Sequence, residues 1–119
     1  MRLVNLTNRT ICIYDAEGVR PLYELPTSPP AISVDATLEP VKHLGSNQDI
    51  PVVRHQFRLT SELPPPQPGV TYLVGWPVIQ ALLEAGDKRA DLVAPDTGRG
   101  SAVRDAGGQI VGVRRFRVA

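Results

Sequence analysis

The sequence predicts a mostly β protein (α+β) of about seven to nine short strands with one short helix near residues 77–85. Two observations predict this class. Twelve prolines and ten glycines in 119 residues divide the chain into short segments, which suits strands and turns better than a helical bundle. Apolar residues recur at helical spacing in one segment, whereas the other segments are rich in β-formers. We expect one compact domain over residues 1–119, built from antiparallel sheets, a small β-sandwich or a partial barrel.

Three strands are expected in the first 25 residues. Residues 3–6 (LVNL) and 10–15 (TICIYD) are rich in β-formers, and the turn at 15–18 (DAEG) returns the chain as a hairpin through residues 19–25. Cys12 is the only cysteine, which excludes an internal disulfide and a cysteine-based zinc motif. Its position in an apolar run predicts a buried, inert thiol.

Two longer strands are expected next, over residues 32–39 and 50–59, joined by the polar loop 45–49 (GSNQD) into an antiparallel pair. Apolar and polar residues alternate in both strands, which predicts a half-buried apolar face and an outward polar face. Pro40 marks a bulge or an edge position because proline cannot donate to a ladder. His55 lies on the apolar face, where a core or boundary role is favoured over a catalytic one.

The middle of the chain changes from an extended segment to a strand and then a helix. Residues 63–69 (LPPPQPG) should run extended over the surface, because proline disfavours both helix and ladder. Residues 70–74 (VTYLV) are nearly all β-formers and predict a central strand. Pro77 suits the first turn of the helix, and Gly86 is well placed as its C-terminal cap.

The C-terminal part is expected to close the fold with short strands. Residues 92–95 (LVAP) form one, and residues 96–101 (DTGRGS) form a loop. Two more strands, over 103–105 and 109–118, are joined by Ala-Gly-Gly at 106–108 into a hairpin.

A candidate anion-binding surface lies near this C-terminal end. The formal net charge of +1 gives no overall attraction to nucleic acid or to an anionic membrane, but the residues after position 97 include five arginines against one acidic residue. The 96–101 loop offers backbone amides, hydroxyls and two glycines for close approach to a phosphate or carboxylate, although it lacks the lysine and helix of a P-loop. The alternative is that the arginines are simply solvated on an exposed sheet face. The candidate anion-binding residues are Thr97, Gly98, Arg99, Gly100, Ser101, Arg104, Arg114 and Arg115.

Other signals of chemistry are weak. Trp76 beside the helix start is a candidate anchor for a partner protein, with a buried or lid position as the alternative. The two histidines show no metal-ligand spacing, so neither a metal nor a cofactor is expected. An enzyme reading would use His55 or the carboxylates between Asp96 and Asp105. No signal peptide or membrane-length apolar run is recognisable, so a cytoplasmic location is expected.

Four stretches resemble a family of small uncharacterised proteins encoded in bacteriophage, prophage and bacterial genomes. They are VNLT at 4–7, LPPPQPGVTYLV at 63–74, RADLVAP at 89–95 and VRDAGGQIVG at 103–112, in the same order and over nearly the whole chain. The resemblance implies a mobile-element setting and no particular activity. A Pro-His pair is usual in the family where this chain has Asn8-Arg9, and cysteine is common where it has Val113. These differences imply that neither the histidine nor the cysteine of the family is an indispensable catalytic group here.

We expect a non-catalytic binding or interaction protein. One version is an inhibitor that docks on a host or phage protein through sheet edges or Trp76. A second is a sponge for a nucleotide-type signalling molecule that uses Arg99, Arg104 and the C-terminal arginines. The alternatives are a virion or structural assembly component, in which sheet edges build a homo-oligomer, and a small hydrolase or nuclease of unrecognised type. If the protein is phage-encoded, the host cytoplasm is its expected location.

Overall fold

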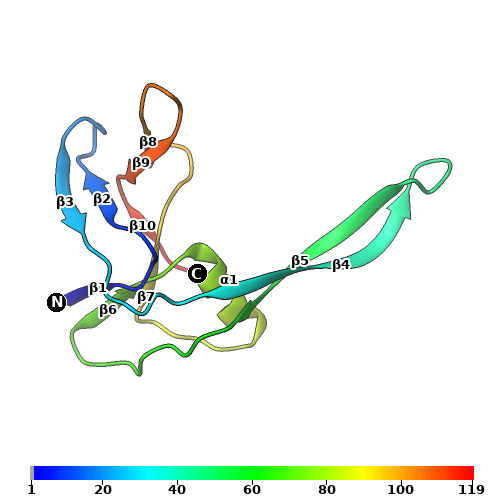
Figure 1. The fold of residues 1–119 in the computed structure, drawn as a ribbon, viewed down its shortest axis with the longest axis horizontal. Coiled ribbons are helices and arrows are strands. Elements are labelled where there is room, and N and C mark those ends of the chain that lie inside the picture. The colour runs from blue at the N-terminus through cyan, green and yellow to red at the C-terminus, as the bar shows by residue number, and fades with distance from the viewer. Residues whose placement is uncertain (1) are drawn as a thin grey trace.

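The computed structural model describes residues 2–119, in which ten strands form three sheets and one segment forms a short α-helix. The prediction of a mostly β protein is confirmed. Figure 1 shows a body that contains two four-stranded sheets and a long two-stranded arm that projects from it. Neither four-stranded sheet closes into a barrel within residues 2–119.

The first sheet contains, in spatial order, β1 (Arg2–Asn5), β6 (Val70–Leu73), β7 (Leu92–Pro95) and β10 (Phe116–Arg117). β1, β6 and β7 run parallel, and β10 is antiparallel to β7. The sheet is therefore mixed rather than wholly antiparallel. The helix α1 (Trp76–Glu84) connects β6 to β7, and a helical crossover of this kind is what brings two consecutive strands into parallel alignment. β6 is a central strand, as predicted.

The main hydrophobic core lies between this sheet and α1. Its buried side chains are Leu6, Tyr72, Val74, Val78, Ile79, Leu82, Leu92 and Ala94. The predicted helix and its glycine cap are both confirmed. Pro77 lies in the first helical turn, and Gly86 follows the last turn with φ of 77°. The Gly86 N–H donates to the Leu83 carbonyl at 3.1 Å, which satisfies one of the orphan carbonyl groups at the helix end.

The second sheet contains, in spatial order, β3 (Pro21–Leu25), β2 (Ile11–Tyr14), β9 (Ile110–Val113) and β8 (Ala102–Arg104). The predicted hairpins β2–β3 and β8–β9 are both present. β2 and β9 meet in parallel at Ile13 and Val113. Gly112 permits this approach, because a Cβ there would lie only 2.6 Å from the Cys12 carbonyl oxygen.

The single strand predicted over residues 109–118 is wrong. The chain forms β9 in the second sheet, breaks at Arg114 and Arg115, and then forms β10 in the first sheet. At the break, the backbone N–H groups of both arginines donate to Ser101 Oγ at 3.3 Å, and the Arg114 N–H also donates to the Ser101 carbonyl at 2.9 Å. Ser101 therefore satisfies the backbone where the chain passes from one sheet to the other.

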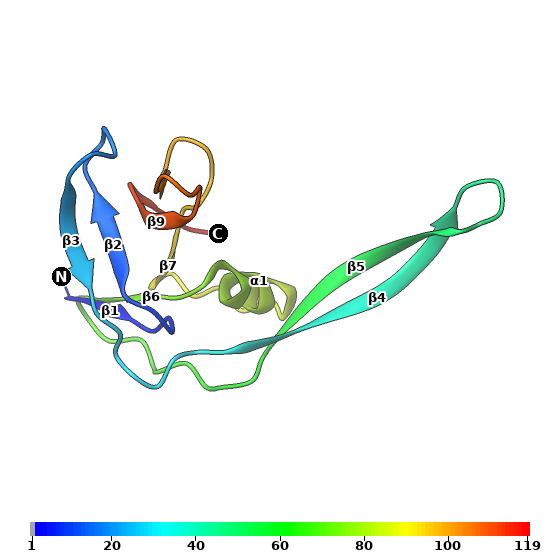
Figure 2. The ribbon, with the colours of Figure 1, turned by 45° about the horizontal axis from the view of Figure 1, so that its top comes forward.

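The arm consists of β4 (Val34–Leu44), the connecting turn and β5 (Ile50–Leu59), and Figure 2 shows it leaving the body beside α1. The antiparallel pairing and the bulge at Pro40 were both predicted, and the register shifts between Pro40 and Lys42. The half-buried face was a wrong prediction beyond the base of the arm, where Leu38 is 59% exposed and His55 is exposed. The reason is geometric: the strands continue past the edge of the core that would cover them.

The proline-rich connection is extended, as predicted. It has no helix or strand over residues 63–68. Two of its carbonyl groups accept hydrogen bonds from side chains of the body. The Tyr72 hydroxyl donates to the Pro65 carbonyl at 3.3 Å, and Arg89 Nη2 donates to the Pro64 carbonyl at 2.9 Å. Among the described residues, no helix has the length and apolar character that crossing a membrane requires.

Candidate functional site

A cleft of about 680 Å³ lies where the two sheets of the body meet the first turn of α1. It is lined by both sheets, by α1 and by two connecting segments. The lining consists of residues 7–12, 31–34, 75–78 and 110–113, together with Pro95 and Thr97. The cleft therefore brings together parts of the chain that are more than 100 residues apart.

The walls of the cleft are largely apolar. Ile11 comes from β2, Val34 from the base of the arm, Trp76 from α1 and Val111 from β9. Trp76 is half-buried, and the guanidinium carbon of Arg117 lies 3.5 Å from the centroid of its ring. This cation–π contact covers one face of the indole and fixes the ring at the cleft wall.

The polar rim of the cleft includes one arginine that has no partner. The Arg9 guanidinium makes no hydrogen bond or ion pair with any residue of the described chain, 2–119, and it is exposed beside the cleft. Thr7, Asn8 and Thr10 flank it, and Thr97 lies on the same lining. An unpaired guanidinium next to apolar walls provides a charge that an incoming anion can use.

Asn5 fixes the backbone of the segment that carries Arg9. Its side chain is buried, with 2% exposed, and all of its hydrogen-bonding groups are used. Asn5 Nδ2 donates to the Arg9 carbonyl at 3.0 Å and to the Leu25 carbonyl at 2.8 Å. Its Oδ1 accepts from the Thr7 N–H at 2.9 Å and from the Thr7 hydroxyl at 2.6 Å. The rim at residues 7–10 is therefore preorganised by a buried amide.

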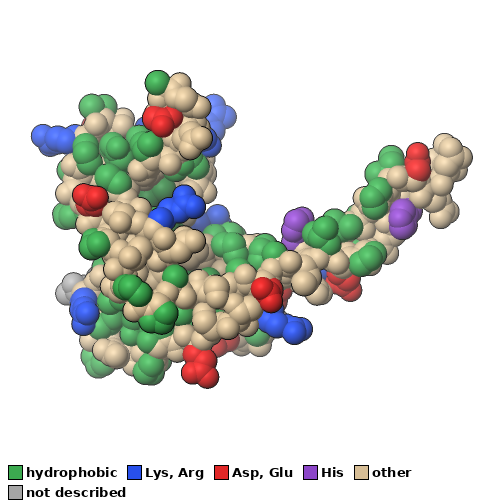
Figure 3. Space-filling view, in the orientation of Figure 1, with side chains coloured by type: hydrophobic (Ala, Val, Ile, Leu, Met, Phe, Trp, Pro, Cys, Tyr) green, Lys and Arg blue, Asp and Glu red, His purple; other side chains and the backbone are tan. Residues whose placement is uncertain are grey.

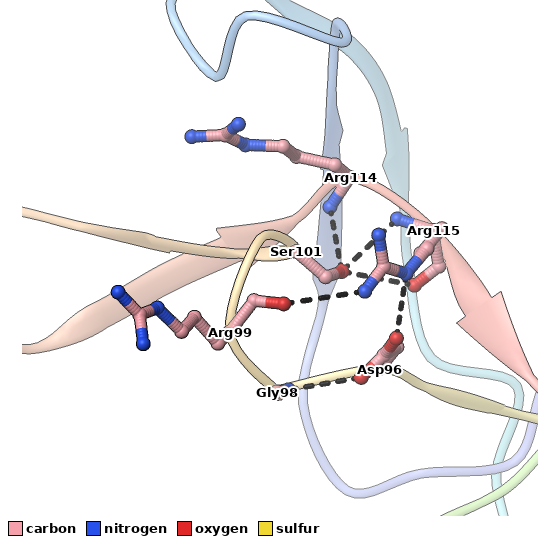
Figure 4. A network of polar contacts seen from close by, with 6 residues as sticks. All are labelled: Asp96, Gly98, Arg99, Ser101, Arg114 and Arg115. Carbon is pink, nitrogen blue, oxygen red and sulfur yellow. Dashed lines mark hydrogen bonds and ion pairs between the residues drawn. The ribbon is translucent and has the colours of Figure 1, made fainter.

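The 96–101 loop holds a polar network in which the Arg115 guanidinium and the Asp96 carboxylate are bound to each other and to the loop backbone (Figure 4). Arg115 Nε donates to Asp96 Oδ2 at 2.7 Å, and Arg115 Nη2 donates to the Arg99 carbonyl at 3.3 Å. The Gly98 N–H donates to Asp96 Oδ1 at 2.9 Å. The hydrogen bond from Arg115, followed by that from Gly98, lowers the pKa of Asp96 below its ordinary value. Arg115 is thus already matched with an internal anion.

The remaining candidate arginines do not converge on a common point. Figure 4 shows the guanidinium groups of Arg99 and Arg114 extending away from that of Arg115. Arg114 Nη1 donates to the Ala16 carbonyl at 3.2 Å, in the turn between β2 and β3. Arg104 Nη1 donates to the Gly108 carbonyl at 2.7 Å, within the β8–β9 hairpin. Of the predicted site residues, the structure brings Trp76 and Thr97 together on the cleft.

The other candidates belong to the loop as structural residues. Gly100 has φ of 86°, a backbone conformation that favours glycine, and Gly98 and Ser101 act in the turn through the Gly98 carbonyl, which accepts from the Ser101 N–H at 3.1 Å. Ser101 is fully buried.

Two residues that line the cleft, Cys12 and Arg9, differ from what the sequence predicted. Cys12 was predicted to be buried, but it is half-buried, because it lines the cleft between the two sheets. Arg9 was not among the candidate site residues. No local signal marks Arg9, because the cleft exists only where residues 110–113 meet the distant segment 7–12.

The residues of the enzyme alternative are separated or already engaged. His55 is exposed on the arm, whereas Asp96 pairs with Arg115 on the body. Asp105 Oδ1 accepts from the N–H groups of Gly107 at 2.9 Å and Gln109 at 3.0 Å. Within residues 2–119, no group of three His, Cys, Asp or Glu side chains is arranged to hold a metal ion.

Comparison with protein-family models, with curated proteins and with solved structures finds no match to this chain.

Proposed function

We propose that this protein is a non-catalytic binding protein that takes up a small organic anion with an aromatic or apolar body in the cleft between its sheets. The observation that carries the proposal is the cleft itself. Its volume of about 680 Å³ lies within the range of roughly 300 to 1,000 Å³ in which proteins hold small molecules. Apolar walls with a few fixed polar groups are the usual composition of such sites.

The chemical class follows from the lining. Ile11, Val111 and the Trp76 ring offer an apolar surface on which a flat ring system loses contact with water. Arg9 offers the one unpaired cation at the rim within the described chain. A guanidinium binds phosphate or carboxylate through parallel N–H donors. Nucleotide-type molecules combine both features, so the proposal is a form of the sponge hypothesis that uses Arg9 and Trp76 in place of Arg99 and Arg104.

The setting implied by the family resemblance fits this activity. A small protein of a mobile element gains from sequestering a signalling molecule without transforming it. Such sequestration needs a preorganised pocket, and the buried Asn5 amide that fixes the rim provides one.

Calorimetric titration tests the proposal with AMP, cyclic AMP, adenosine and inorganic phosphate as probes. We expect the nucleotides to bind and to raise the midpoint of thermal unfolding, and adenosine to bind at least about tenfold more weakly because Arg9 then has no anion to pair with. Arg9→Ala should weaken nucleotide binding about tenfold. Arg20→Ala, which removes an exposed arginine outside the cleft, is the matched control.

Two outcomes would overturn the proposal. One is the absence of any saturable heat with all of the nucleotides. The other is an equal effect of Arg9→Ala and Arg20→Ala, which would show that bulk charge rather than the cleft attracts the anion. Chromatography of the recovered nucleotide distinguishes binding from hydrolysis, because the proposal requires the nucleotide to be unchanged.

A further inference from the structure

The arm, residues 34–59, is in contact with the body only at its base. Val34 and Leu59 pack against the main core, and the Phe57 N–H donates to Glu84 Oε2 of α1 at 3.4 Å. Beyond these contacts the two strands continue away from the body (Figures 1 and 2). A two-stranded ribbon without a covering layer is marginally stable in water, so packing against another surface would stabilise this part of the chain.

One face of the arm continues the hydrophobic core outward. Directly opposed residues of an antiparallel pair share a face. From the base outward, the register gives the pairs Val34–Leu59, Ala36–Phe57, Leu38–His55 and Pro40–Val53 on this face. We call it the apolar arm face. The opposite face carries the pairs Asp35–Arg58, Thr37–Gln56 and Glu39–Arg54.

The apolar arm face is open to solvent away from its base. Leu38 is 59% exposed and Val53 is 42% exposed, although both are aliphatic side chains within β4 and β5. Figure 3 shows the arm as a thin extension with apolar side chains at its surface. Contiguous exposed apolar side chains of this kind mark interaction surfaces.

The chain exposes more surface than a compact protein of the same mass. The chain exposes 8229 Å², whereas a compact monomer of 12.9 kDa is expected to expose about 6,300 Å². The excess is about 1,900 Å² per chain. The radius of gyration, 17.1 Å, likewise exceeds the value of about 13.5 Å expected for a compact chain of this length. The excess includes both faces and the edges of the arm, and burial of about 800 Å² of it on each copy would give a protein–protein interface of standard size, about 1,600 Å².

The charge of the arm fits a second copy better than a charged partner. The arm contains three acidic and three basic side chains, so its formal charge balances. These are Asp35, Glu39, Asp49, Lys42, Arg54 and Arg58. A neutral surface has no electrostatic attraction to nucleic acid or to an anionic membrane, and it has no repulsion from an identical surface. Pro40 and Pro51 each remove a backbone donor from the ribbon, which favours association through a face over association through an edge.

We propose that the apolar arm face packs against the same face of a second copy of this chain across a twofold axis, so that the protein is a dimer joined by its arms. The contact is isologous: Leu38 and Val53 of each copy face the arm of the other. Two ribbons stacked in this way give the second layer that each ribbon lacks alone. The inference is independent of the ligand proposed for the cleft.

Sedimentation equilibrium of the full chain tests the inference. We expect the wild type to sediment at twice the 12.9 kDa chain mass at micromolar concentration. The double variant Leu38→Glu/Val53→Glu should weaken dimerisation at least about 100-fold, because each copy then places two carboxylates in the apolar contact. The matched control is Thr37→Glu/Gln56→Lys on the opposite face. This variant should still sediment with the mass of a dimer.

Three results would overturn the inference. They are a wild type that remains a monomer at 200 µM, a dimer that survives Leu38→Glu/Val53→Glu, and a control variant that dissociates as readily as the test variant. The milder pair Leu38→Ser/Val53→Thr keeps the test decisive if the glutamate variant does not fold, with circular dichroism as the check of folding. If the wild type is a monomer, the partner of the apolar arm face is a different protein and not a second copy.

Discussion

At the scale of single residues, the body depends on buried polar side chains that each satisfy several backbone groups. Asn5 and Ser101 are the two buried polar residues of the described chain. Asn5 links the 5–9 segment to the end of β3, and Ser101 accepts the N–H groups at the crossing between the sheets. Because these groups are buried, removing one partner leaves the others without hydrogen bonds and without water.

Replacement of Asn5 measures this effect. Asn5→Ala removes all four hydrogen bonds of a buried side chain, those to the Arg9 and Leu25 carbonyl groups and those from the Thr7 N–H and hydroxyl, and we expect the free energy of unfolding to fall by about 2 to 4 kcal/mol. Asn8→Ala, three residues away and exposed, should change it by less than about 0.5 kcal/mol. Urea denaturation of the two variants provides the comparison. Equal stability of the two would show that the Asn5 hydrogen bonds contribute nothing net.

The candidate site illustrates what the sequence can and cannot indicate at this scale. Trp76 and Thr97 were selected from local composition, and both line the cleft. Arg99 and Arg104 are close in sequence but do not form one site: the Arg104 guanidinium donates to the Gly108 carbonyl of its own hairpin, and the Arg99 guanidinium extends away from that of Arg115. Arg9 was not predicted, because its place on the cleft depends on β9, which lies about 100 residues further along the chain.

At the scale of elements, local pairings were predictable and distant ones were not. The β2–β3 hairpin, the arm and the β8–β9 hairpin each have a turn signal between two β-rich runs, and α1 has its own spacing and glycine cap. The parallel pairs β1–β6 and β2–β9 have no turn signal, because the strands are separated by long stretches of chain. The break between β9 and β10 was also hidden, since no proline interrupts residues 109–118 and β-formers stand on both sides of Arg114 and Arg115.

Gly112 tests the long-range pairing of β2 with β9. In Gly112→Ala, the new Cβ would contact the Cys12 carbonyl oxygen and the Tyr14 ring, and the backbone oxygen cannot rotate away. We expect a loss of about 1 to 3 kcal/mol in the free energy of unfolding. Gly107→Ala in the same hairpin is the control, because its Cβ would lie 3.4 Å from Asp105 Oδ1, and it should change stability by less than about 1 kcal/mol. A smaller loss for Gly112→Ala than for the control would contradict the pairing.

The connection between α1 and β7 contains an ion pair that should make stability sensitive to acid. Arg89 Nη2 lies 2.7 Å from Asp91 Oδ2, and the two side chains are 14% and 16% exposed. The hydrogen bond from Arg89 lowers the pKa of Asp91 below its ordinary value, against the opposing effect of burial. A carboxyl with a lowered folded-state pKa stabilises the fold above its unfolded pKa of about 3.9. This contribution is lost as the pH falls through the folded-state pKa.

Asp91→Asn should therefore reduce the dependence of stability on pH. We expect the variant to be less stable than the wild type at pH 7, by about 1 to 3 kcal/mol, and the difference to shrink below about pH 4. Asp87→Asn is the control, because Asp87 is exposed on the same connection. Urea denaturation from pH 7 to pH 2.5 gives both curves. Parallel curves for wild type and Asp91→Asn would exclude the coupling.

At the scale of the whole molecule, the arm and the body are two different kinds of structure. The body has a core between α1 and the first sheet, whereas the arm has an apolar face and no covering layer within the described chain. The alternation of apolar and polar residues in β4 and β5 is the same for a covered strand and for a projecting one. The sequence therefore predicted the hairpin but could not predict that it leaves the body.

A shortened arm separates the two parts. Glu39 and Arg54 are directly opposed, so residues 40–53 can be replaced by an Asn-Gly turn that closes a shorter hairpin. Because the deleted segment contributes no buried core residue, we expect the midpoint of thermal unfolding of the body to change by less than about 4 °C when measured against the monomeric double variant. Scanning calorimetry checks this. Loss of cooperative unfolding would show that the body requires the outer arm.

The parallel pairing of β1 with β6 also has a consequence for the order in which the molecule is built. During synthesis, Arg2–Asn5 cannot find its neighbour until Val70–Leu73 has emerged, and β2 must wait still longer for β9. The β2–β3 and β4–β5 hairpins close over short loops and can form meanwhile on the microsecond scale. The first strand of the chain is thus incorporated late, and the nascent polypeptide exposes an incomplete sheet until most of its length has been translated.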